Sequence, residues 1–152
     1  LDESDLLFDP LTFTIATGND DDRRLGLETL EGIRLISERF PHCGIILGLS
    51  NISFGLKPSA RAVLNSVFLE EARERGLTSA IVHASKILPR ARISDEHWEA
   101  ARWLIFDLRG ANRPAGMPEN FDPLLHFIGL FPDGEETAKV EVIDPATTMP
   151  ER

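Results

Sequence analysis

The fold class is decided by an apolar run, Ile45-Ile46-Leu47-Gly48-Leu49-Ser50-Asn51, which ends in small and polar residues. It is the second of three similar segments. The first comprises Leu6-Leu7-Phe8, Asp9-Pro10 and residues 11–16, and the third comprises residues 79–84. All three are short and rich in branched side chains. Continuous apolar strands of this kind are typical of a parallel sheet that is covered on both faces.

A helix with an apolar stripe is predicted after each segment. The helices are expected to run from the acidic caps at Asn19–Asp22 to Pro41, from Pro58 to Gly76, and from Ser94 to Gly110. The residues that form the stripes are Gly26, Leu30, Ile33, Ser37 and Phe40, then Leu64, Val67, Phe68 and Ala72, then Trp98, Ala101, Ile105 and Leu108. Three strand–helix units in succession predict right-handed crossovers and a parallel sheet.

Three units cannot close a (β/α)8 barrel, which takes roughly 250 residues. The chain is therefore expected to be either a small open sheet or the last third of a barrel. A first residue of Leu rather than Met favours a segment of a longer protein. Residues 111–152 are rich in Pro and Gly and are expected to be a linker or tail that leads to a following domain. Within them, residues 121–131 are apolar enough for one short docking helix. The predicted units are thus 1–110 and 111–152.

The composition limits the classes of molecule that this chain is expected to bind. The 152 residues carry a net charge of −9, from 16 Lys and Arg against 25 Asp and Glu. Nucleic acids and anionic membranes are therefore not expected as partners. The sequence has no run of apolar residues long enough to span a membrane and no secretory signal. Cys43 is the single cysteine, so an intrachain disulfide and a cysteine-based zinc site are excluded, and a cytoplasmic location is the default expectation.

Ligands of parallel α/β sheets bind at the C-terminal ends of the strands, where two polar elements stand out. Asp9 is either a turn former before proline or a carboxylate that accepts paired N–H groups from a ligand. Asn51 lies in a loop of small residues, Gly48–Gly55, which is either a structural turn or a ligand contact. Its amide could bond a ring nitrogen in either protonation state.

These stretches point to a family. Asp9-Pro10-Leu11-Thr12-Phe13-Thr14-Ile15-Ala16-Thr17-Gly18 and Gly48-Leu49-Ser50-Asn51-Ile52-Ser53-Phe54-Gly55-Leu56 together resemble the pterin-binding domain of cobalamin-dependent methionine synthases. Residues 61–69 and 79–82 extend the similarity, which covers roughly residues 5–110. The Asp-Pro element alone is shared with dihydropteroate synthases.

The resemblance implies a partial TIM (β/α)8 barrel of the dihydropteroate-synthase-like type, with the last three strand–helix units plus a C-terminal tail. It implies a methyltransferase that binds 5-methyltetrahydrofolate and passes its methyl group to cob(I)alamin, then to homocysteine. In that family Asp9 would bind the amino-pyrimidine edge of the pterin, and Asn51 would be the catalytic contact to the methyl-bearing nitrogen. Gly48, Ser50 and Ser53 would complete the substrate loop. Cobalamin, homocysteine and zinc would be held by other domains or subunits, and no metal site is expected in this chain.

Three alternatives remain open. A dihydropteroate-synthase-like enzyme is disfavoured because the neutral loop Ser50–Ser53 replaces the basic residues that would bind pyrophosphate. A methyltransferase that acts on a corrinoid protein is closer. A non-catalytic α/β binding module, completed by another subunit, is the third.

Other residues favour structural roles. His83 is expected to be a hydrogen-bonded core histidine, and Arg61 and Lys86 to be surface charges rather than contacts to the glutamate carboxylates of folate. The stretch from Asp122 to Gly129 has one residue too many before His126 to match the cobalamin motif Asp-x-His-x-x-Gly. His126 is therefore assigned to the docking helix.

Overall fold

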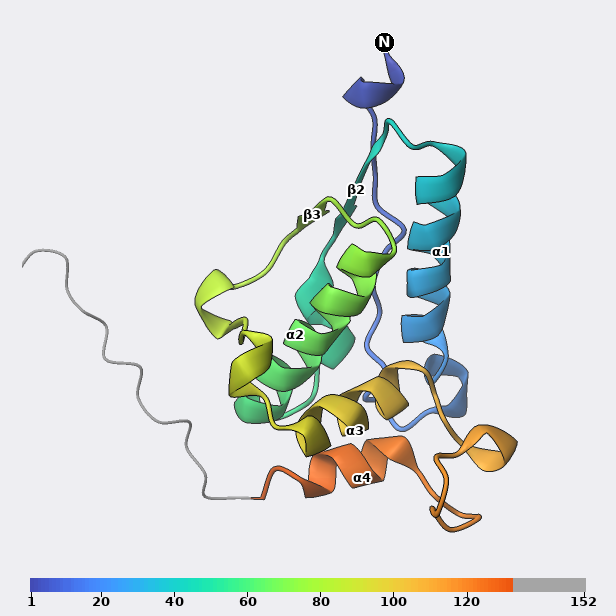
Figure 1. Ribbon diagram of the computed structural model, residues 1–152, viewed down its shortest axis with the longest axis vertical. Coiled ribbons are helices and arrows are strands. Elements are labelled where there is room, and N and C mark those ends of the chain that lie inside the picture. Colours follow the sequence, from blue (N-terminus) through green and yellow to red (C-terminus); the bar gives the residue numbers. More distant parts are fainter. Residues whose placement is uncertain (133–152) are drawn as a thin grey trace, which may run out of the picture.

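The computed structural model describes residues 1–132 of the chain (Figure 1). Three parallel strands, β1 (Leu7–Phe8), β2 (Gly44–Leu47) and β3 (Ser79–Ala80), lie side by side in that order. Helix α1 (Leu25–Arg39) connects β1 to β2, and α2 (Pro58–Glu74) connects β2 to β3. This arrangement confirms the predicted strand–helix alternation and the parallel sheet.

The regular strands are shorter than the apolar runs predicted. Residues 11–16 form no strand, because the chain turns at Pro10 and Leu11 adopts a left-handed conformation with φ of 66°. After β2 and β3 the chain enters 3-10 turns at Leu49–Ser53 and Ala84–Lys86. Burial also alternates along β2, where Ile45 and Leu47 are buried but Ile46 is only half-buried. Within residues 1–132 the sheet is therefore fully covered on one face rather than on both.

Helices α2 and α3 begin where they were predicted. Helix α1 begins later, at Leu25, because the predicted caps at Asn19–Asp22 form a separate 3-10 turn that precedes it. Helix α2 begins at Pro58, and Gly76 follows its end with φ of 109°. Helix α3 (Asp95–Ile105) is capped by Ser94, whose hydroxyl accepts the N–H of His97 at 3.2 Å. It ends before the expected stop at Gly110, because Asp107 takes a φ of 50° that a right-handed helix excludes.

The core lies between the sheet and the helices. Apolar side chains from β2, α1, α2, α3 and the segment after β1 fill it, and the largest of them are fully enclosed. These include Ile15, Leu30, Ile33, Ile45, Leu47, Leu64, Phe68, Leu104 and Ile105. The predicted stripe residue Phe40 is instead exposed, because it lies beyond the last turn of α1.

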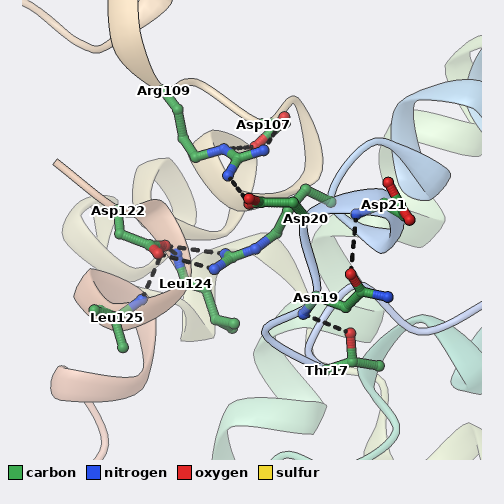
Figure 2. A network of polar contacts seen from close by, with 10 residues as sticks. Thr17, Asn19, Asp20, Asp21, Asp107, Arg109, Asp122, Leu124 and Leu125 are labelled. Atoms are coloured by element: carbon green, nitrogen blue, oxygen red, sulfur yellow. Dashed lines mark hydrogen bonds and ion pairs between the residues drawn. The ribbon is translucent and has the colours of Figure 1, made fainter. Parts of the chain in front are cut away.

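The predicted docking helix is present as α4 (Pro123–Gly129), which packs along α3 (Figure 1). Asp122 caps it by accepting the N–H of Leu124 at 2.8 Å. The same carboxylate receives two bonds from the buried Arg23, at 3.0 and 2.8 Å (Figure 2). This pair joins the start of α4 to the segment before α1. Residues 133–152 of the expected tail lie outside the described residues, and the domain boundary near 110 stays a prediction.

A second arginine reinforces this corner of the molecule. Arg109 donates to Asp107 at 2.6 Å and to Asp20 at 2.7 Å (Figure 2). These bonds raise the pKa of Arg109 further above its ordinary value, so the guanidinium keeps its positive charge in this network. In residues 1–132, no helix combines the length and the apolar character that crossing a membrane requires.

Candidate functional site

Asp9 follows β1 directly and is exposed. Its Oδ1 accepts the N–H of Leu11 at 2.9 Å, which closes a turn over Pro10 and accompanies the left-handed backbone of Leu11. The turn-forming interpretation of Asp9 therefore holds. The carboxylate nevertheless keeps acceptor capacity, because Oδ2 accepts no hydrogen bond from residues 1–132 and each oxygen has two lone pairs.

Asn51 lies at the middle of the turn that follows β2. Its N–H donates to the carbonyl of Gly48 and its own carbonyl accepts the N–H of Phe54, both at 3.2 Å. The side chain is exposed and lies close to Gly48, where a Cβ atom would stand 3.2 Å from the Asn51 amide nitrogen. Glycine at position 48 thus leaves room for this amide.

Two hydrogen bonds join the segment after Asp9 to the turn that carries Asn51. The hydroxyl of Thr14 donates to the carbonyl of Phe54 at 2.8 Å, and the N–H of Ile15 donates to the carbonyl of Ile52 at 3.2 Å. Because β1 and β2 are parallel, Asp9 and Asn51 both lie beyond the C-terminal ends of their strands, at the same end of the sheet. The structure therefore brings the two predicted segments together at the C-terminal end of the sheet.

The turn rests on a buried polar group from α2. Arg61 donates from Nε to the hydroxyl of Ser53 and from Nη2 to the carbonyl of Ser50, both at 3.1 Å. The Ser53 hydroxyl in turn donates to Oδ1 of Asn65 at 2.7 Å. The side chain of Ser53 is completely buried, so in this structure it holds the turn in place and does not face solvent.

Comparison with known proteins assigns the family. The description "pterin binding enzyme" matches residues 1–83. The chain belongs to this family. Two curated relatives are the methionine synthases of Mycobacterium tuberculosis, 54% identical over 131 residues, and Mycobacterium leprae, 50% identical over 147 residues. These alignments cover 86% and 93% of this chain but only 10% and 12% of the relatives. The chain thus spans about a tenth of their length, and the resemblance drawn from its motifs is confirmed.

This member of the pterin-binding enzymes has a cavity of about 270 Å³ beside the turn. Ser50 of the turn borders it, together with three basic side chains from two successive units: Arg61, His83 and Lys86. His83 is exposed and its Nδ1 lies 3.0 Å from the Ser85 hydroxyl. The prediction of a core histidine was therefore wrong.

Sequence reasoning also missed Asn65 and the supporting role of Arg61. The available signal was their spacing, because residues four apart share one helix face and Asn65 interrupts the buried side of α2. The place of Lys86 had no such local signal, since it depends on how the loop after β3 folds back onto α2.

Proposed function

We propose that this chain supplies the C-terminal part of a barrel that binds 5-methyltetrahydrofolate and supports transfer of its methyl group to cob(I)alamin in a methionine synthase. The proposal is carried by the two hydrogen bonds, from Thr14 and Ile15, that join the segment after Asp9 to the Asn51 turn. Both segments lie at the C-terminal end of a parallel sheet. The identity to methionine synthases over most of the chain supports it. The homocysteine and zinc sites are assigned to other domains.

Asp9 is proposed to bind the pterin. The amino-pyrimidine edge of a pterin presents adjacent N–H donors, and a carboxylate can accept two such bonds at once. The exposed Oδ2 and the remaining lone pair of Oδ1 supply the two acceptors. The turn through Pro10 and Leu11 holds the carboxylate in place, so little conformational entropy is lost on binding.

Asn51 is proposed to stabilise the reactive form of the substrate. In methyl transfer the N5–methyl bond breaks and both of its electrons stay on N5, while the acceptor nucleophile forms the new bond to carbon. Protonation of N5 beforehand makes the leaving group a neutral amine. The Asn51 amide can turn its oxygen toward that N–H, so it favours the protonated form and the transition state that follows.

The described residues do not fit cobalamin. The nearest motif requires His126 as a ligand, but its ring packs against Trp103 and Phe121, at 5.5 and 5.4 Å between centroids. Asp122 of the same motif is paired with Arg23. The methyl acceptor is therefore assigned to another domain, and this chain's role is limited to binding and activating the folate.

The test is a calorimetric titration of 5-methyltetrahydrofolate into a complete barrel that carries this chain, joined for example to the upstream barrel units of the Mycobacterium tuberculosis relative. Loss of a charge-assisted bidentate contact in Asp9→Asn is expected to weaken binding about 10- to 100-fold. Asn51→Ala removes one hydrogen bond, so binding is expected to weaken about three- to tenfold.

Asp5→Asn serves as the matched control, because Asp5 is an exposed carboxylate that precedes β1 at the opposite end of the strand. It should leave the dissociation constant unchanged. A folded barrel that gives no heat at millimolar folate would overturn the proposal and favour a non-catalytic module.

A further inference from the structure

We propose that the cavity bordered by Arg61, His83 and Lys86 is an oxyanion subsite that holds the glutamate carboxylates of the folate substrate. This inference rests on the proposed function, because it assigns a place to the anionic end of the same ligand. It departs from the sequence-based expectation that Arg61 and Lys86 are solvated surface charges.

The charge of the cavity is the first argument. The chain as a whole carries a net charge of −9, yet none of the described residues that line this cavity is acidic. Neither Arg61 nor Lys86 forms an ion pair with a carboxylate among residues 1–132. Two cations and a histidine that converge without an acidic partner are suited to an anionic ligand.

The basic groups are held in place by the fold. Arg61 is anchored through Nε and Nη2 to the turn, and its Nη1 donates no bond to the described residues. Across the cavity, the N–H of Lys86 donates to the carbonyl of His83 at 2.9 Å. The N–H of Leu88 donates to the hydroxyl of Ser66 on α2 at 2.8 Å. These bonds hold the loop of His83 and Lys86 against α2, the helix on which Arg61 lies.

Position and size indicate which part of the ligand would bind. Ser50 lines the cavity and is the neighbour of Asn51, so the cavity adjoins the proposed pterin site. Its volume of about 270 Å³ is slightly below the roughly 300–1,000 Å³ typical of pockets that enclose a whole ligand. It therefore suits a terminal group. Folate has its pterin at one end and its two carboxylates at the other, so a pterin held by Asp9 and Asn51 would direct its tail outward.

A phosphate is the other source of the same chemistry. Loops after consecutive strands of α/β barrels often bind phosphate. We assign the cavity to carboxylates because the N–H groups of Asn51 and Phe54 are already bonded to carbonyls of the turn, and the charged groups that border the cavity are side chains. Inorganic pyrophosphate is the probe that separates the two sources.

The experiment compares two ligands in the complete barrel that carries this chain: 5-methyltetrahydrofolate, and 5-methyltetrahydropterin without the aminobenzoyl-glutamate tail. Lys86→Gln and His83→Gln are expected to weaken folate binding about three- to tenfold each, and to leave binding of the tail-less pterin unchanged. The loss should shrink at high salt, because both side chains are exposed. Arg61 is not substituted, since it also supports the turn.

Arg39→Ala is the matched control, because it removes an exposed cation at the end of α1, which leads into the start of β2, whereas the cavity adjoins the turn that follows the end of β2. If neither ligand binds, the proposed function fails. If both ligands bind equally well, or if Lys86→Gln weakens both to the same degree, the subsite fails while the proposed function stands. Pyrophosphate that binds more tightly than the whole folate, with the affinity lost in Lys86→Gln, would overturn the carboxylate assignment.

Discussion

At the scale of single residues, Gly48 tests whether the orientation of Asn51 matters. An added Cβ would come within 3.2 Å of the Asn51 amide nitrogen, so Gly48→Ala forces that exposed side chain to move. We expect stability to change by less than about 1 kcal/mol, because an exposed side chain can shift without a clash in the core. Folate binding should weaken about three- to tenfold, as for the loss of one hydrogen bond.

Calorimetry with folate and urea denaturation of the same variant separate the two effects. Gly116→Ala is a useful comparison, since it lies far along the chain and its added Cβ would meet no atom within 4 Å, although its φ of 85° carries a backbone penalty. Unchanged folate affinity in Gly48→Ala would remove the argument that glycine is required beneath the amide.

Asp122 makes stability depend on pH. Its burial opposes ionisation, but the hydrogen bonds from Arg23 and from the N–H of Leu124 prevail and lower the pKa of Asp122 in the folded state. A carboxylate with a lowered folded pKa stabilises the protein fully above its unfolded pKa, about 3.9, and this contribution is lost as the pH falls through the folded value.

Asp122→Asn is therefore expected to lower the free energy of unfolding by about 2–4 kcal/mol at pH 7, since it leaves Arg23 buried with its charge unpaired. The difference from the parent should narrow below about pH 4. Urea denaturation at pH 7 and pH 3 measures both values. A difference that stays constant between the two pH values would show that the ion pair does not account for it.

The Asp9 and Asn51 segments and His83 show which features of the site could be predicted from the sequence and which could not. The pairing of the Asp9 and Asn51 segments could be predicted, because both follow strands that leave the same edge of a parallel sheet. The environment of His83 could not, because an apolar run before a histidine fits a core position as well as an exposed turn. Its exposure follows from the 3-10 turn at Ala84–Lys86, which depends on the Leu88–Ser66 contact with α2.

At the scale of elements, Glu71 joins two helices. The Glu71 side chain is 8% exposed. Its carboxylate pairs with Arg75, which directly follows α2, and with Arg102 of α3, both at 2.8 Å. Glu71→Gln removes the charge that both arginines share, so we expect it to lower the free energy of unfolding by about 1.5–3 kcal/mol.

The neighbouring residue provides the control for this prediction. Glu70 pairs with Arg73 one turn along the same helix, but both side chains are far more exposed, at 40% and 66%. Glu70→Gln should barely change the urea midpoint, because solvent screens exposed pairs. Equal effects of the two substitutions would mean that the buried position of Glu71 adds nothing to the packing of α2 on α3.

Helices were predictable from the sequence to a greater degree than strands. The apolar stripes of the three helices, Pro58 at the start of α2 and the Ser94 cap of α3 are local signals, and they placed α2 and α3 where they begin and α1 nearly so. The strands were overestimated because a strand needs a hydrogen-bonded neighbour. Among the described residues β1 and β3 each pair only with β2, so their ladders cover two residues each. Where the chain leaves the ladder, at Leu11 and Gly48, apolar residues continue in turns.

At the scale of the whole molecule, the outer edge of β1 has no partner strand among residues 1–132. Large apolar side chains around it are exposed: Leu6 at 43%, Leu7 at 56%, Leu11 at 54% and Phe13 at 55%. Unpaired edges of this kind promote association with other chains. In the barrel that we propose, an upstream unit would cover the apolar surface at this edge.

The chain alone is therefore expected to associate with itself as its concentration rises, which size-exclusion chromatography with light scattering would measure. A charge on the edge opposes strand addition, so Leu7→Lys should shift the chain toward the monomer. Leu125→Lys should not, because Leu125 is 69% exposed on α4, away from the edge. Joining the chain to upstream barrel units should abolish association altogether. A chain that stays monomeric at every concentration and melts cooperatively would instead indicate an open sheet that is complete in itself.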